Sequence, residues 1–138
     1  EGQDIVADYG SVGLTLRRHP LSLLRDKLRG RGIVPARELW EQPNGRRVKT
    51  AGLVITRQRP GSASGVIFVT MEDETGYVNL IVWSRVAEAQ RAPLLESRLL
   101  EVSGTLQREG DVQHVIAERL VNLSGMLGDL AVASRDFH

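Results

Sequence analysis

The sequence predicts a mainly β domain: a five-stranded barrel with a helix between the third and fourth strands, preceded by a short helical segment. Three observations support this fold class. Leucines near the N-terminus recur at helical spacing, whereas apolar and polar residues alternate from Arg46 onward, as they do in strands. Turn signals divide this alternating region into five runs, and a helix-like run separates the third from the fourth.

The N-terminal segment, residues 1–44, is predicted to be a helical connector. Pro20 suits the first turn of a helix, and Gly30 and Gly32 are expected to end it. A second short helix is expected over Ala36–Trp40. The apolar face of the first helix is predicted to consist of Leu21, Leu24 and Leu28.

A barrel domain is predicted over residues 45–124, with the turn QPNG as its boundary and residues 125–138 as a short helix followed by a loose end. Gly52 is expected to introduce a bulge or bend into the first strand. The predicted strands are Arg46–Gln58, Val66–Met71, Tyr77–Trp83, Arg98–Arg108 and Val112–Leu123.

The helix between the third and fourth strands is expected over Arg85–Arg91, with Ser84 as its cap and Pro93 as an interruption. A long, glycine-containing first strand and a helix at this point are features of the OB fold, in which the helix closes the bottom of a five-stranded barrel. The order of elements therefore predicts an OB fold.

Alternation assigns the faces of the second and third strands. The purely aliphatic sets, which begin at Ile67 and Val78, belong inside the barrel, so Phe68 and Asn79 are expected on the outer face. In OB folds this face holds single-stranded nucleic acid, with the loops that join strands one to two and four to five. Trp83, at a strand end before a helix, is expected to pack rather than to stack on a base.

Basic residues are concentrated in one stretch of the chain. No acidic residue lies between Glu41 and Glu72, whereas five basic residues do; one of them lies just before the glycine-rich loop RPGSASG and another is its first residue. A cationic groove with exposed aromatic rings binds the backbone and stacks the bases of single strands. The candidate nucleic-acid-binding residues are Arg46, Arg47, Lys49, Arg57, Arg59, Phe68, Tyr77, Asn79, Arg108 and His114.

Composition bounds the other function classes. The chain has 138 residues, a net charge of +1 and no cysteine, which excludes disulfides and thiolate metal sites. It has no apolar run long enough to cross a bilayer and no signal-peptide pattern at its start, so a cytoplasmic protein without a membrane partner is expected.

No catalytic or metal-binding residue is predicted in this sequence. Glu72, Asp73 and Glu74 are adjacent at a turn, where carboxylates diverge instead of converging on one point. The histidines at positions 19, 114 and 138 lack the spacing of a metal site, and the loop serines have no base nearby.

Seven short motifs occur in order along the chain, and the resemblance they carry covers nearly all of it. They resemble the carboxyl-terminal part of bacterial C-family DNA polymerases of the alpha-subunit type, in particular the error-prone, damage-inducible branch. Upstream, DYGSVGLTLRRHPLSLLR (Asp8–Arg25) resembles the connector that follows a helix-hairpin-helix module in these enzymes. The motifs are AGLV (Ala51–Val54), RQRPG (Arg57–Gly61), EDETG (Glu72–Gly76), NLIVW (Asn79–Trp83), GTLQREG (Gly104–Gly110), HVIAERL (His114–Leu120) and SRDFH (Ser134–His138).

The resemblance implies a module that holds single-stranded template in a translesion DNA polymerase acting in damage-induced mutagenesis. It implies that Phe68 stacks on a nucleotide and that Asn79 reads or steadies it. Nucleotidyl transfer with Mg²⁺ would belong to aspartates of a palm domain outside this sequence, and accessory mutagenesis proteins are implied as partners. Two alternatives stay open: a tRNA anticodon-binding module, and a protein-docking barrel without a nucleic-acid role.

Overall fold

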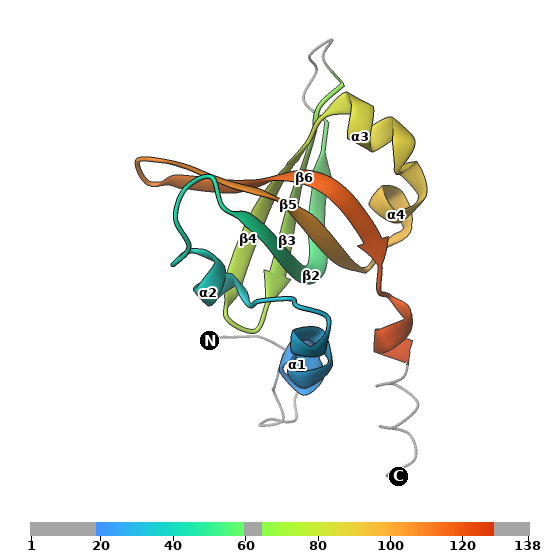
Figure 1. The fold of residues 1–138 in the computed structure, drawn as a ribbon. Coiled ribbons are helices and arrows are strands. Elements are labelled where there is room, and N and C mark those ends of the chain that lie inside the picture. Colours follow the sequence, from blue (N-terminus) through green and yellow to red (C-terminus); the bar gives the residue numbers. More distant parts are fainter. Residues whose placement is uncertain (1–18, 60–64, 129–138) are drawn as a thin grey trace.

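A computed structural model describes residues 19–59 and 65–128, and it contains a closed five-stranded barrel (Figure 1). The strand order around the barrel is β2-β3-β4-β6-β5, and helices lie before β2 and between β4 and β5. The predicted fold class is therefore confirmed. The strands are β2 (Arg47–Gln58), β3 (Ile67–Asp73), β4 (Gly76–Val82), β5 (Leu99–Glu109) and β6 (Val112–Asn122).

The first strand, β2, belongs to both halves of the barrel. Its first part pairs with β5 up to Leu53, and from Leu53 onward it pairs with β3. The expected irregularity lies later than Gly52: the register shifts between Val54 and Thr56. Gly52 instead marks a close approach of strands, because a Cβ there would come within 2.8 Å of the Cβ of Met71.

Two short helices, α3 (Ser84–Ala89) and α4 (Arg91–Glu96), replace the single expected one. The N-cap of α3 is Trp83 and no side chain caps it, so the expected Ser84 cap is wrong. Pro93 does not interrupt a helix: it lies in the first turn of α4, where its missing N–H needs no partner. Leu94 of α4 is buried in the barrel core.

The interior of the barrel follows the predicted alternation. Inward-facing residues of β3 and β4 are almost fully buried, and they pack with residues of β5, β6, α2 (Ala36–Leu39) and α4. Truncating one of these side chains to alanine typically costs about 2–5 kcal/mol. The buried residues of the two strands are Ile67, Val69, Met71, Val78, Leu80 and Val82.

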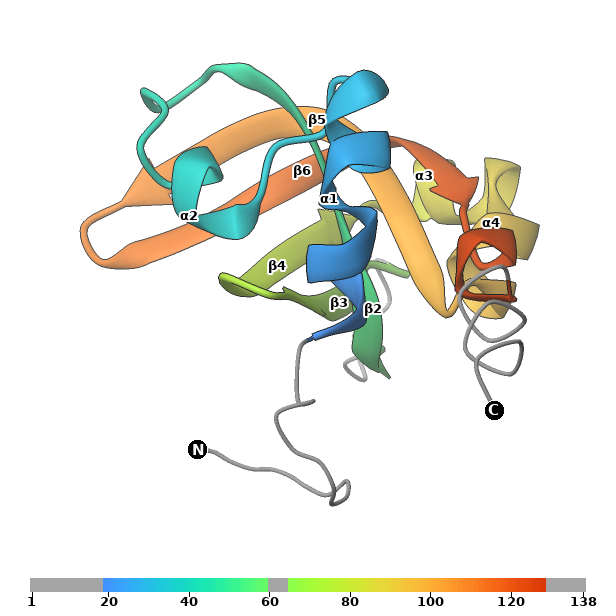
Figure 2. The same cartoon turned by 90° about the horizontal axis from the view of Figure 1, so that it is seen from below.

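A second hydrophobic core joins helix α1 (Pro20–Gly30) to the outside of the barrel (Figure 2). Leu21, Leu24 and Leu28 of α1 pack with Ala51 of β2 and Leu99 of β5. The predicted leucine face is thus confirmed, and it has a partner within this chain. The domain boundary near residue 44 stays a prediction. Among the described residues, the helices are too short or too polar to span a bilayer.

Candidate nucleic-acid interface

One row of outward-facing residues crosses all five strands. Strand pairing links Phe68 to Ile81, Ile81 to Ile116, Ile116 to Thr105, and Thr105 to Arg47. Because directly paired residues point to the same side of a sheet, these five form one continuous line on the outer surface, here called the outer row. Its apolar part lies over β3, β4 and β6, and its cationic end lies on β2.

Three aromatic side chains lie on or next to this surface. Phe68 is 39% exposed, and Tyr77, at the opposite end of β4, is 58% exposed. Trp83 is 48% exposed, so the expectation that it packs is wrong for about half of its surface. Sequence alternation groups Trp83 with Tyr77, Asn79 and Ile81 on the outer face, and only its position at the strand end led to the expectation of packing. Ile116 was missed, although it alternates in the same way within β6.

A polar pair stands beside the outer row. Thr70 and Asn79 face each other across β3 and β4, and the Thr70 hydroxyl donates to Asn79 Oδ1 at 3.2 Å. Among the described residues, no hydrogen bond occupies the amide nitrogen of Asn79, which is exposed. This side chain is thereby oriented by its neighbour and can donate to the edge of a base.

Arg57 does not lie on the face of Phe68. It pairs with Val69, so its side chain points to the side of the strand that faces α4; although Arg57 is exposed, it donates to the carbonyl oxygens of Leu94 (2.7 Å) and Ser97 (2.5 Å) at the end of that helix. The register shift between Val54 and Thr56 is the cause, because it reverses the faces of the strand beyond it. The structure therefore gives Arg57 a role in holding the end of α4, and its predicted role in nucleic-acid binding stays a prediction.

Arg108 also has structural partners. Its Nη2 donates to the carbonyl oxygens of Trp40 (2.6 Å) and Gln42 (3.0 Å), and its Nε donates to Gln113 (2.9 Å). These bonds tie the β5–β6 hairpin to the segment that follows α2. These bonds use three of the five N–H groups of the guanidinium, and the predicted role of Arg108 in phosphate binding stays a prediction.

The remaining predicted cations differ in how they are held. Arg47 Nη1 pairs with Glu118 at 2.5 Å, and Lys49 Nζ donates to the carbonyl oxygen of Arg31 at 3.0 Å. The Arg47 hydrogen bond, with a smaller one from Thr105, lowers the pKa of Glu118 below its ordinary value. Arg46 is exposed at the start of β2.

Two predicted residues flank the ends of this surface. Arg59 is exposed and directly follows Gln58, the β2 partner of Phe68; residues 60–64 of the predicted basic loop lie outside the described residues. His114 faces Gln107 across the β5–β6 hairpin, with His114 Nε2 and Gln107 Oε1 2.9 Å apart. The terminal motif SRDFH lies outside the described residues as well.

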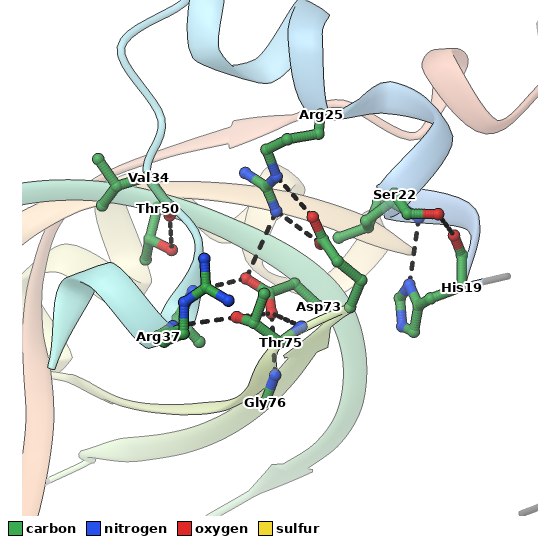
Figure 3. Close-up of polar contacts among 12 residues, drawn as sticks. His19, Ser22, Arg25, Val34, Arg37, Thr50, Asp73, Thr75 and Gly76 are labelled. Atoms are coloured by element: carbon green, nitrogen blue, oxygen red, sulfur yellow. Dashed lines mark hydrogen bonds and ion pairs between the residues drawn. The ribbon is translucent and has the colours of Figure 1, made fainter.

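The acidic motif at the β3–β4 turn is a structural centre (Figure 3). Asp73 is buried; its Oδ1 accepts from Thr75 N–H (2.7 Å), Thr75 O–H (2.8 Å) and Gly76 N–H (3.1 Å), and its Oδ2 accepts from the N–H of Ala36 (2.7 Å). Within residues 19–59 and 65–128, no three metal-ligating side chains converge. The predicted turn is confirmed, and it also anchors the start of α2.

Helix α1 is joined to the same turn by an ion pair. Arg25 donates to both carboxylate oxygens of Glu74, at 2.7 Å each, and lies 3.5 Å from Asp73. The hydrogen bond from Arg25 is the main reason that the pKa of Glu74 lies below its ordinary value. Arg25 and Glu74 are largely enclosed, so this bidentate pair contributes more than an exposed one.

Comparison with known proteins identifies this region. The family described as "OB-fold nucleic acid binding domain" matches residues 48–123. Curated proteins named error-prone DNA polymerase match the whole chain or nearly so: one from Alkalilimnicola ehrlichii is 59% identical over 100% of this chain, and one from Methylococcus capsulatus is 53% identical over 99%. The chain spans 14% and 13% of the lengths of these relatives.

Among solved structures, asparaginyl-tRNA synthetase from Pyrococcus horikoshii resembles the chain with a TM-score of 0.55 and 26% identity. The match covers 66% of this chain and 23% of the synthetase chain. The sequence resemblance to error-prone polymerases is thus confirmed at higher identity and over more of the chain than the resemblance to the synthetase.

Proposed function

Because the chain belongs to the family of OB-fold nucleic-acid-binding domains, we propose that it binds single-stranded DNA along the outer row. The observation that carries the proposal is the unbroken apolar line of Phe68, Ile81 and Ile116, with an exposed ring at its end. A ring of this kind stacks on any base, because every base has a π face.

The other parts of the surface supply complementary contacts. Asn79 donates to a base edge, while Arg46 and Arg47 lie at the β2 side, where a phosphate backbone can reach them. Arg47 must then exchange its partner Glu118 for a phosphate. Affinity is expected to fall steeply with salt, because each phosphate contact releases counterions.

We place this binding within an error-prone DNA polymerase, where the module guides damaged template toward the polymerase centre. The high identity to proteins of that name over the whole chain supports this placement. Nucleotidyl transfer, its Mg²⁺ ions and any accessory mutagenesis proteins belong to the remainder of such a polymerase.

The test is a titration of the 138-residue chain with a labelled oligo(dT) of about 10 nucleotides, followed by fluorescence anisotropy. Phe68→Ala is expected to weaken binding by about 1–3 kcal/mol, which is roughly 5- to 150-fold in Kd. Leu95→Ala removes a comparably exposed side chain from α4 and is the matched control, expected to bind as the parent does. Equal affinity of the two variants would rule out stacking on Phe68.

A tRNA anticodon-binding role is the second candidate, favoured by the resemblance to the asparaginyl-tRNA synthetase. Competition separates the two: we expect oligo(dT) to be displaced by single-stranded DNA more readily than by an equal concentration of transfer RNA. Preferential displacement by transfer RNA would favour the second candidate. If neither polymer binds better to the parent chain than to Phe68→Ala, the face has a different partner, such as a protein.

A further inference from the structure

We infer that Trp83 is a second stacking platform, placed so that two neighbouring bases lie on Trp83 and Phe68. This inference rests on the proposed function and specifies how the single-stranded DNA lies on the surface of the outer row. Its starting point is that a large aromatic side chain is 48% exposed while the other tryptophan, Trp40, packs against the barrel core. Trp83 belongs to neither hydrophobic cluster of the described residues.

The backbone fixes the face on which Trp83 lies. Trp83 directly follows the last residue of β4 and keeps an extended conformation, with φ −68° and ψ 155°. It therefore continues the alternation of Asn79 and Ile81 and points outward. Val82, which lies between Ile81 and Trp83, is fully buried. Trp83 is thus on the face of the outer row, one outward position beyond Ile81.

The spacing of the two rings suits adjacent nucleotides. Phe68 pairs with Ile81, so Trp83 is its diagonal neighbour, two residues further along β4. Two strand residues span about 7 Å. This is about twice the ~3.4 Å between stacked bases in one strand of a duplex, so the two bases must separate and each can lie on its own ring.

A cation-bearing connection reaches the barrel at the same end. Gln58, which pairs with Phe68, leads directly into Arg59. The other end of that connection returns at Gly65, where an added Cβ would lie 3.0 Å from the Cβ of Ser84, the residue after Trp83. Both rings therefore lie next to the place where the β2–β3 connection leaves and rejoins the barrel, and Arg59 supplies a positive charge there.

The chain carries its own reporter for this inference, because Trp40 and Trp83 are its only tryptophans. Trp40→Phe leaves Trp83 as the sole tryptophan, and Trp83→Phe leaves Trp40. We expect unlabelled oligo(dT) to quench the tryptophan emission of Trp40→Phe and to leave that of Trp83→Phe unchanged. In the anisotropy titration, Trp83→Ala is expected to raise Kd at least about fivefold, with Leu95→Ala as the matched control.

The outcomes separate this inference from the function on which it rests. If oligo(dT) binds with a Phe68-dependent Kd but leaves the emission of Trp40→Phe unchanged, and Trp83→Ala binds like the parent, the second platform is wrong and the proposed function stands. If oligo(dT) does not bind the parent chain at all, both are wrong. Circular dichroism of each variant shows whether a lost affinity reflects a lost fold.

Discussion

The two ends of the β3–β4 hairpin have opposite character. At the turn, the polar groups of Asp73 and Glu74 are bonded to the backbone and to Arg25, and the turn is joined to both α1 and α2. At the other end, Phe68 and Trp83 expose apolar rings to solvent. Apart from the exposed Tyr77, the turn end uses its side chains to hold the fold together, whereas the other end leaves its aromatic rings available. Substitutions at the turn should therefore change stability, and substitutions at the open end should change binding.

The largest effect is expected from Asp73→Ala. The substitution removes an acceptor from the N–H groups of Ala36, Thr75 and Gly76 and leaves the charge of Arg25 with one partner fewer. Loss of such a buried charged centre costs about 3–5 kcal/mol of the free energy of unfolding, measurable by urea denaturation. Glu72→Ala, in the same turn region but partly exposed, is the control and should cost less than about 1 kcal/mol. The folded Asp73→Ala chain should bind the oligonucleotide with the affinity of the parent. A loss of affinity would contradict the division into a turn end that determines stability and an open end that determines binding.

A smaller effect is expected from Arg57→Ala, and it sharpens the comparison because Arg57 lies near the open end. Its two charge-assisted bonds to the end of α4 predict a loss of about 1.5–3 kcal/mol in the free energy of unfolding. Its direction toward α4, away from the face of Phe68, predicts unchanged oligonucleotide affinity.

Arg46→Ala, which removes an exposed cation, should have the opposite effects. The free energy of unfolding should change little, and the salt dependence of binding should become shallower by about one phosphate contact. Weaker binding by Arg57→Ala alone would contradict the assigned direction of this side chain.

The smallest effect is expected from pH at the turn. The pKa of Glu74 lies below its ordinary value of 4.5, so its bond to Arg25 stabilises the folded chain above that pH, and this contribution is lost as the pH falls through the lowered pKa. The melting temperature of the parent should therefore decline more steeply below about pH 4.5 than that of Glu74→Gln. Glu109→Gln, which removes an exposed carboxylate at the tip of the β5–β6 hairpin, is the matched control for the loss of one negative charge.

Alternation made the barrel and its outer face predictable. The residues of β3 and β4 keep strict alternation between two registered strands, so Phe68 and Asn79 could be placed outside without coordinates. Arg57 was chosen from the clustering of basic residues, which carries no information on direction, and an unbroken alternation from Arg47 would put it outside as well. The register shift after Val54 reverses the strand, and the sequence around it, LVITRQ, gives no sign of the shift.

The polar partners were the other part that pattern reasoning could not supply. EDETG has the composition of an ordinary turn, and its bonds to Arg25 and Ala36 join residues 49 and 37 positions apart in the chain. Likewise, Arg108 is bound to the carbonyl oxygen of Trp40, 68 positions away. Long-range hydrogen bonds of this kind form only when the closed barrel brings distant residues together. They therefore cannot be predicted from local sequence patterns.

The closure of the barrel between β4 and β6 has a consequence for a bound strand. This seam is parallel and pairs only Leu80 with Val115 and Ile81 with Ile116, whereas every other seam is longer and antiparallel. Separation of β4 from β6 breaks the fewest main-chain hydrogen bonds, so local opening of the barrel should begin between these two strands. A single strand of DNA bound from Phe68 to Ile116 would hold β4 and β6 together. Binding should then slow the hydrogen exchange of the main-chain amides that pair these two strands, although the DNA contacts only their side chains.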